Sequence, residues 1–117
     1  MESERLLILR EAELIDQETF EKVSKIMKAV IDRFGLDLES ENGQMFITHV
    51  SMAVMRIKNN EATVVMENEI FEEIKESIHY NDALKFSEII EEIIEYNVPK
   101  HEKEYLIING CLLMEKD

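Results

Sequence analysis

The stretch that decides the fold is DQETFEKVSKIMKAVIDRFG, residues 16–35. Its apolar residues recur every three or four positions, and this spacing places their side chains on one face of an α-helix. These residues are Phe20, Val23, Met27, Val30, Ile31 and Phe34. Asp16 can cap the first turn, and Gly35 can end the helix in the left-handed conformation. The stretch therefore predicts an amphipathic helix whose apolar face other helices must cover.

Similar patterns continue on both sides of this stretch. Residues 1–15 include several leucines and predict a short helix or an extended arm. Further on, the spacing predicts one helix from Gln44 to about Lys58, one from about Thr63 to Ser77, one capped by Asn81 or Asp82, and one that begins at Pro99. We expect the helix from about Thr63 to Ser77 to bury Met66, Ile70, Phe71, Ile74 and Ile78. We expect the last helix to bury Tyr105, Ile108 and Leu112.

The composition supports helices throughout. The 117 residues include only three Gly and one Pro, and 45% of them are hydrophobic. This length suits one domain with one core, and neither an internal repeat nor a linker divides the chain. The sequence therefore predicts a single domain over residues 1–117, folded as a compact all-α bundle of five to six helices.

The charge balance indicates which partners to expect. Lys and Arg number 13 against 26 Asp and Glu, so the formal net charge is −13. This charge opposes binding to a phosphate backbone, and we expect protein partners and no direct contact with nucleic acid. A single cysteine, Cys111, leaves no pair for a disulfide and suits the cytoplasm. No stretch approaches the ~20 apolar residues of a membrane span, and we expect no membrane contact.

Motifs for catalysis are missing from the sequence. It has no glycine-rich phosphate loop and no serine elbow, so we expect a protein that is not an enzyme and has no cofactor. The three histidines, His49, His79 and His101, lie on separate elements, without the i, i+4 spacing that puts two imidazoles on one helical face. We therefore expect no metal site.

His49 has an unusual setting, ITHVSMAVMRI, residues 47–57. An imidazole on an otherwise apolar helix costs stability unless it has a partner. On this pattern alone, a packed histidine at the edge of the core is the more frequent interpretation. Arg56 follows two turns later on a similar side of the helix.

Two segments resemble the signatures of the phosphotransferase-system regulation domains, the PRD family. The first is GQMFITHVSMAVMR, residues 43–56, which resembles a signature reading His, three residues, Ala, two residues, Arg. His49, Ala53 and Arg56 stand at these positions. The second is EKEYLII, residues 102–108, in which Glu102 precedes the aromatic Tyr105 by three residues. The resemblance covers about Thr19 to Leu113 and implies the helical bundle of that family.

In that family a histidine accepts a phosphoryl group from the phosphocarrier HPr or from a sugar-permease component, and the modification changes dimerisation. The resemblance implies that His49 is the phosphoacceptor, with Arg56 beside the phosphate, and that the protein is a homodimer. The second signature carries Asn109 where the family has its histidine, so that site is lost. We expect no effector domain beside the bundle, and therefore a stand-alone regulator that acts on a separate effector protein. The alternative is an interaction or dimerisation module that is not phosphorylated.

Overall fold

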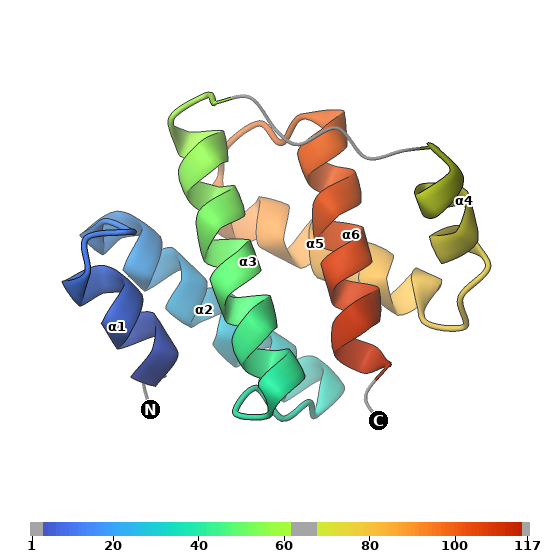
Figure 1. Cartoon of the computed structure of the whole chain (residues 1–117), viewed down its shortest axis with the longest axis horizontal. Coiled ribbons are helices and arrows are strands. Elements are labelled where there is room, and N and C mark those ends of the chain that lie inside the picture. The colour runs from blue at the N-terminus through green and yellow to red at the C-terminus, as the bar shows by residue number, and fades with distance from the viewer. Residues whose placement is uncertain (1–3, 62–67, 116–117) are drawn as a thin grey trace.

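The computed structural model describes residues 4–61 and 68–115, and it shows six α-helices in these ranges (Figure 1). The helices are α1 (Glu4–Glu11), α2 (Gln17–Phe34), α3 (Glu41–Lys58), α4 (Asn68–Lys75), α5 (Tyr80–Ile94) and α6 (Lys100–Met114). The predicted all-α bundle of five to six helices is confirmed. None of the described helices has the length and apolar character that crossing a membrane requires.

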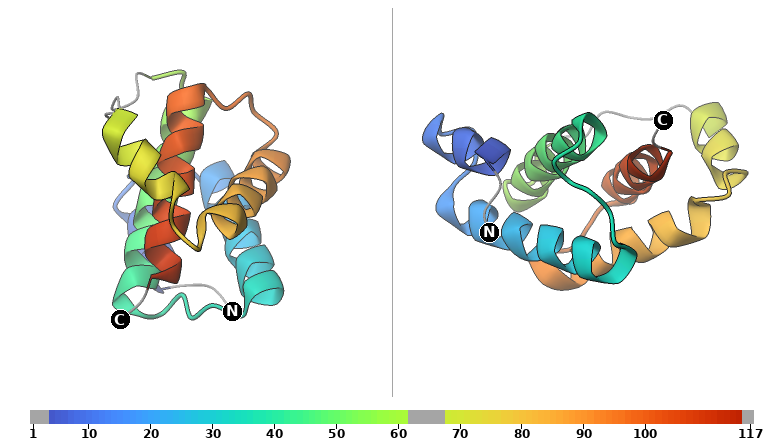
Figure 2. Two further views of the ribbon diagram at one scale, coloured as in Figure 1. Left: turned by 90° about the vertical axis from the view of Figure 1, so that its right-hand side faces the viewer. Right: turned by 90° about the horizontal axis from the view of Figure 1, so that it is seen from below.

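The helices form two layers. Seen from below, α1, α3, α6 and α4 lie in one row, and α2 and α5 form a second row behind it (Figure 2). Within the first row α3 and α6 are neighbours that run in opposite directions (Figure 1). Because α2 and α5 cover only one side of this pair, the other side of α3 and α6 faces outward.

The core lies between the two layers and is centred on Phe86 of α5, which is fully buried. The Phe86 ring meets the Phe34 ring of α2 edge to face, with ring centroids 4.4 Å apart. It also contacts Phe46 of α3, at 6.0 Å between centroids. Aromatic pairs in this geometry add to the gain from burying their area. The expectation that α2 buries an apolar face is met for Phe20, Val23, Met27 and Val30, while Ile31 remains 43% exposed.

Two glycines allow close approaches of the backbone. A Cβ atom on Gly43 would lie 2.4 Å from Leu38 Cα, so this position, near the start of α3, has room only for glycine. A Cβ atom on Gly110 would lie 2.8 Å from Phe86 Cδ2 and 3.3 Å from Ala83 Cβ. The absence of a side chain at Gly110 thus lets α6 pack closely on α5.

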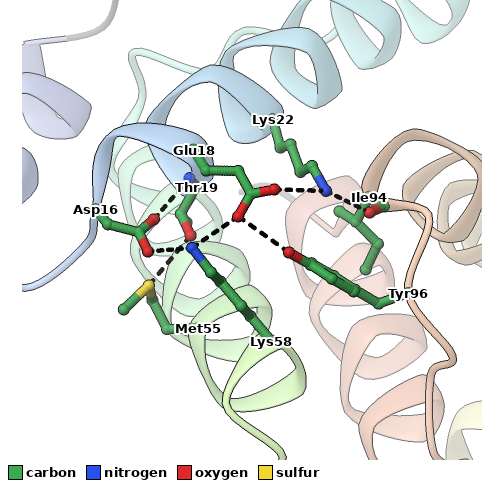
Figure 3. Close-up of polar contacts among 8 residues, drawn as sticks. All are labelled: Asp16, Glu18, Thr19, Lys22, Met55, Lys58, Ile94 and Tyr96. Atoms are coloured by element: carbon green, nitrogen blue, oxygen red, sulfur yellow. Dashed lines mark hydrogen bonds and ion pairs between the residues drawn. The ribbon is translucent and has the colours of Figure 1, made fainter.

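The predicted ends of α2 are confirmed. Asp16 is the N-cap, and its side chain accepts a 2.8 Å hydrogen bond from the Thr19 backbone N–H. Gly35 closes the helix with φ +63°. The ammonium group of Lys58, at the last residue of α3, also binds the Asp16 carboxylate, and it lies 2.7 Å from Glu18 Oε1 (Figure 3). The hydrogen bond from Lys58 is the main reason why the pKa of Asp16 falls to about 2. The hydrogen bonds to Asp16 and Glu18 in turn raise the pKa of Lys58.

The same group of charges reaches the end of α5. Lys22 Nζ donates a 2.6 Å hydrogen bond to the Ile94 carbonyl oxygen in the last turn of α5, where a cation is favourable. The Tyr96 hydroxyl donates to Glu18 Oε1 at 3.0 Å, and Lys22 lies over the Tyr96 ring (Figure 3). We call Asp16, Glu18, Lys22, Lys58 and Tyr96 the Lys58 cluster. It joins α2, α3 and the segment after α5.

Three predicted helix starts were wrong by one to three residues. The second long helix begins at Glu41 instead of Gln44, because Ser40 is its N-cap and accepts a 3.0 Å hydrogen bond from the Gly43 N–H. The next predicted cap, at Asn81 or Asp82, is also wrong, since α5 begins at Tyr80 and the N-cap His79 makes no side-chain capping bond. Pro99 is the N-cap of α6 and not its first residue.

Some predicted buried positions were wrong as well. The segment predicted as a helix over 63–77 is helical from Asn68 to Lys75, and residues 62–67, which include Met66, lie outside the described residues. Ile78 is 91% exposed, because it falls in the turn after α4. Ile70 lies on α4, which packs mainly on α6, and it is 43% exposed. Leu112 is 50% exposed, since α6 directs Ile107 and Cys111 toward Ala83 of α5 instead.

Candidate functional site

His49 lies in the third turn of α3, on the side that faces α6. Its ring is half-buried, and Nδ1 lies 2.7 Å from Oδ1 of Asn109. Asn109 belongs to α6 and is only 6% exposed, and its Nδ2 donates a 2.8 Å hydrogen bond to the Tyr105 carbonyl oxygen. The two residues that the resemblance aligns with the family's histidine positions therefore touch each other. The imidazole is bound at one nitrogen.

Arg56 lies two turns further along α3 and holds Glu102 of α6. The guanidinium Nε donates to Glu102 Oε2 at 2.8 Å and a terminal nitrogen donates to Oε1 at 3.1 Å, which is a bidentate pair. The Glu102 side chain is 1% exposed, while Arg56 is 21% exposed. The hydrogen bonds to Glu102 raise the pKa of Arg56, against the opposing effect of burial. Arg56 therefore binds the Glu102 carboxylate in this structure, and its place beside a phosphoryl group on His49 stays a prediction.

Tyr105 occupies the space between these two contacts. Its ring lies 6.0 Å from the His49 ring, centroid to centroid, at 62°. The guanidinium of Arg56 lies 5.0 Å from the centroid of the same Tyr105 ring, which allows a cation–π contact. We call His49, Arg56, Glu102, Tyr105 and Asn109 the α3–α6 row.

The spacing of the row follows from antiparallel helices. Arg56 comes seven residues after His49, and Glu102 comes seven residues before Asn109. Seven residues are about two turns, or roughly 10.5 Å along a helix, so two antiparallel helices can make both contacts at once. This equal spacing, with opposite charges at one end, is the signal in the sequence that could have identified the pair of Arg56 and Glu102.

A small pocket opens beside the His49 ring. Its volume is about 30 Å³, and its lining includes His49, Asn109, Asn42, Met45 and Leu112. Met45 and Leu112 are each 50% exposed and form apolar walls on α3 and α6. None of the lining residues carries a formal charge when the imidazole is neutral. The outer side of His49 is thus open and mainly apolar.

The N-terminal helix contacts the residue before His49. Arg5 of α1 donates to Thr48 Oγ1 at 3.0 Å and to Gln44 Oε1 at 3.1 Å. Leu6 and Leu9 of α1 are buried in the main core. This contact was not predicted from the sequence, because the partners of Arg5 come from a helix about forty residues away.

The other candidate residues lie elsewhere. His79 is the N-cap of α5, and His101 is exposed on the first turn of α6, 3.6 Å from Glu104. Ser51 is fully buried on α3, and its hydroxyl has no hydrogen-bond partner in the described part of the chain. Cys111 is fully buried, as predicted, and burial raises the pKa of its thiol.

Comparisons with known proteins identify the family of this sequence. The uncharacterized protein YhfY of Escherichia coli (strain K12) is 27% identical over 105 residues, which cover 90% of this chain and 88% of that protein. No solved structure gives a significant match. The model of the PRD domain family matches residues 24–109, a range that contains every residue of the α3–α6 row and leaves out α1. Because that match covers well over half of the sequence, the chain belongs to the PRD domain family.

Proposed function

We propose that this protein is a regulatory domain of carbohydrate phosphotransferase signalling in which His49 accepts a phosphoryl group. The donor is a histidine-phosphorylated protein, either HPr or a sugar-permease component. The proposal rests on membership of the PRD domain family and on one structural observation. The half-buried His49 ring is bound at one nitrogen and borders an open pocket.

The chemistry of the ring supports this role. A neutral imidazole is nucleophilic at cellular pH and forms a labile bond to phosphorus. The donor protein must bring its own phosphohistidine to the ring, which requires one open side. Met45 and Leu112 leave that side accessible, while Asn109 occupies the other side.

Phosphorylation would change the character of this surface. A phosphoryl group brings about −1.5 to −2 charges at pH 7. It would stand between Met45 and Leu112, on a chain whose formal net charge is already −13. An apolar contact across the outer side of α3 and α6 would weaken, because the new charge resists removal from water. We therefore propose that phosphorylation controls the association of this face, either in a homodimer or with a separate effector protein.

A phosphotransfer assay tests the proposal. The chain is incubated with phosphoenolpyruvate, enzyme I and HPr, and then with HPr plus permease components, and the intact mass is measured. We expect one phosphoryl group that acid removes and alkali does not. His49→Ala should abolish it, while His79→Ala and His101→Ala, changed on other helices, should keep it. Circular dichroism confirms that each variant is folded.

Two results would contradict the proposal. The first is no adduct with either donor on a folded chain. The second is an adduct that survives His49→Ala, since that would move the phosphate to another residue.

A second function has support from one position. Asn109 replaces the histidine of the second signature, and the Met45 and Leu112 side chains are half exposed beside it. These features favour an interaction or dimerisation module that works without phosphate. In that case the mass assay finds no adduct, and the sedimentation coefficient of the chain is the same before and after incubation with the donors. For either function we propose a non-enzymatic protein of the cytoplasm, a location that the single cysteine supports.

A further inference from the structure

We infer that Asn109 is a positioning residue that fixes the tautomer of His49 and makes Nε2 the nucleophilic nitrogen. The inference deepens the proposed function and rests on it for the phosphoryl step. The tautomer itself is a property of the unmodified protein. It can be measured whether or not a donor is found.

The first step is the orientation of the Asn109 amide. Its Nδ2 lies 2.8 Å from the Tyr105 carbonyl oxygen, which can only accept a hydrogen bond. Turning the amide over would place two acceptor oxygens against each other. The amide therefore directs its NH2 group toward Tyr105 and its oxygen toward His49. Asn109 is 6% exposed, so water does not compete freely for either atom.

The second step is the position of the histidine proton. Asn109 Oδ1 accepts, so Nδ1 of His49, 2.7 Å away, must donate and carries the hydrogen. In the neutral ring the other nitrogen, Nε2, then holds the free lone pair. No hydrogen bond to Nε2 is made by the described part of the chain. The nucleophilic nitrogen is thus the one that Asn109 does not hold.

The third step is the balance of the transfer. The Nε2 lone pair attacks the phosphorus atom of the donor's phosphohistidine and forms an N–P bond. The donor's own N–P bond breaks, and its electron pair returns to the donor ring. The other nitrogen of that ring carries a proton, so the ring leaves as neutral imidazole. The Nδ1 proton stays on His49 and continues to bind Asn109 Oδ1. In the reverse transfer His49 also leaves as neutral imidazole, so the same hydrogen bond keeps the phosphoryl group transferable.

This mechanism gives Asn109 a role of its own. Asparagine cannot accept a phosphoryl group on a ring nitrogen, but it supplies an acceptor with a fixed direction. The second signature of this chain then serves the histidine of the first signature. The substitution removes one phosphorylation site and orients the other.

The test is ¹⁵N NMR of histidine-labelled protein at about pH 8, where exposed imidazoles are largely neutral. His79→Gln and His101→Gln leave His49 as the single histidine. We expect the proton on Nδ1 and an unprotonated Nε2. In Asn109→Leu the ratio of the two tautomers should shift toward Nε2–H by on the order of fivefold, the value of one neutral hydrogen bond. Asn109→Asp, which keeps an acceptor oxygen, should retain the proton on Nδ1.

Asn42→Leu is the matched control, because it removes an amide from the same pocket without a hydrogen bond to His49. The inference is overturned if His49 carries its proton on Nε2 in the chain that keeps Asn109, a measurement that needs no variant at position 109. It is also overturned by an unchanged ratio in a folded Asn109→Leu chain.

The phosphorylated protein gives the second readout. ³¹P–¹⁵N coupling should place the phosphoryl group on Nε2, and Asn109→Leu should accept it more slowly, by at most about the same factor. A phosphoryl group on Nδ1 would overturn the inference and leave the proposed function intact. The expected tautomer without any phosphoryl transfer would do the reverse.

Discussion

The Lys58 cluster and the α3–α6 row both depend on α3, yet they treat charge in opposite ways. In the cluster, Lys58 meets two carboxylates whose side chains are 40% and 46% exposed, so water and salt reach every partner. In the row, Glu102 is 1% exposed and its charge is balanced by Arg56 inside the bundle. We therefore expect ion pairs of similar length to differ in energy, because the cost of removing one partner depends on burial.

The two groups also differ in how completely their polar side chains are paired within the described part of the chain. The Lys58 cluster has each charged group paired and joins three parts of the chain (Figure 3). His49, by contrast, is bound at Nδ1 and open at Nε2. The ion pairs at the end of α3 thus lie apart from the proposed phosphorylation site near its middle.

Arg56→Met should have the largest effect on stability. The substitution removes the bidentate partner of the buried Glu102 carboxylate, and we expect a loss of about 3 kcal/mol in the free energy of unfolding. Urea denaturation followed by circular dichroism measures it. The double variant Arg56→Met with Glu102→Leu should regain most of the loss, because no buried charge remains. A loss below about 1 kcal/mol for the single variant would contradict the distinction between the two regions.

Lys58→Met should have a smaller effect, below about 1 kcal/mol, because its partners are exposed to solvent. A high salt concentration should separate the effects of Lys58→Met and Arg56→Met on stability. In about 1 M NaCl the difference between Lys58→Met and the unaltered chain should nearly vanish, since charges at the surface are screened over about 3 Å. The effect of Arg56→Met should persist under the same conditions. Equal salt sensitivity of both variants would show that the pair of Arg56 and Glu102 is not shielded.

Acid should produce the smallest change. Lys58 lowers the pKa of Asp16 from 3.8 to about 2, so the ionised carboxylate stabilises the fold above about pH 4. This stability is lost as the pH falls from about 4 to about 2. Screening by solvent limits it to under about 1 kcal/mol. Urea denaturation at pH 5 and pH 3 should show a larger acid-induced loss for the unaltered chain than for Asp16→Asn, which keeps the cap on Thr19. Equal losses would mean that Lys58 does not hold Asp16 in its ionised form.

Much of the fold was predictable, because its main signals are local. The helix α2 begins after Asp16 and ends before Gly35 as expected, since a cap and a left-handed glycine act within a few residues of the helix end. The predicted burial of Leu112 and Ile78 was wrong, because periodicity shows which residues share a face and not which helix covers that face. Their exposure depends on where α6 and α4 end up in the bundle.

The site was predictable in part. The position of His49 on α3 followed from its helical surroundings and the family signature. Its contact with Asn109 needs the antiparallel pairing of two helices sixty residues apart. The same holds for Arg56, whose spacing from His49 suggested a shared face, while the structure gives its guanidinium to Glu102. Partners on another helix are set by tertiary packing, and a single helix pattern does not contain them.

Gly110 allows the close packing of α6 on α5, next to the site residue Asn109. Its missing side chain lets Phe86 and Ala83 of α5 come into contact with α6 one residue away from Asn109. The depth at which α6 sits on α5 therefore sets how far Asn109 reaches toward α3. Any larger residue at position 110 must move the Phe86 ring or lift α6 outward. The distance from the Asn109 oxygen to the His49 imidazole thus depends on the packing of α6 on α5, at a residue that is itself buried in the bundle.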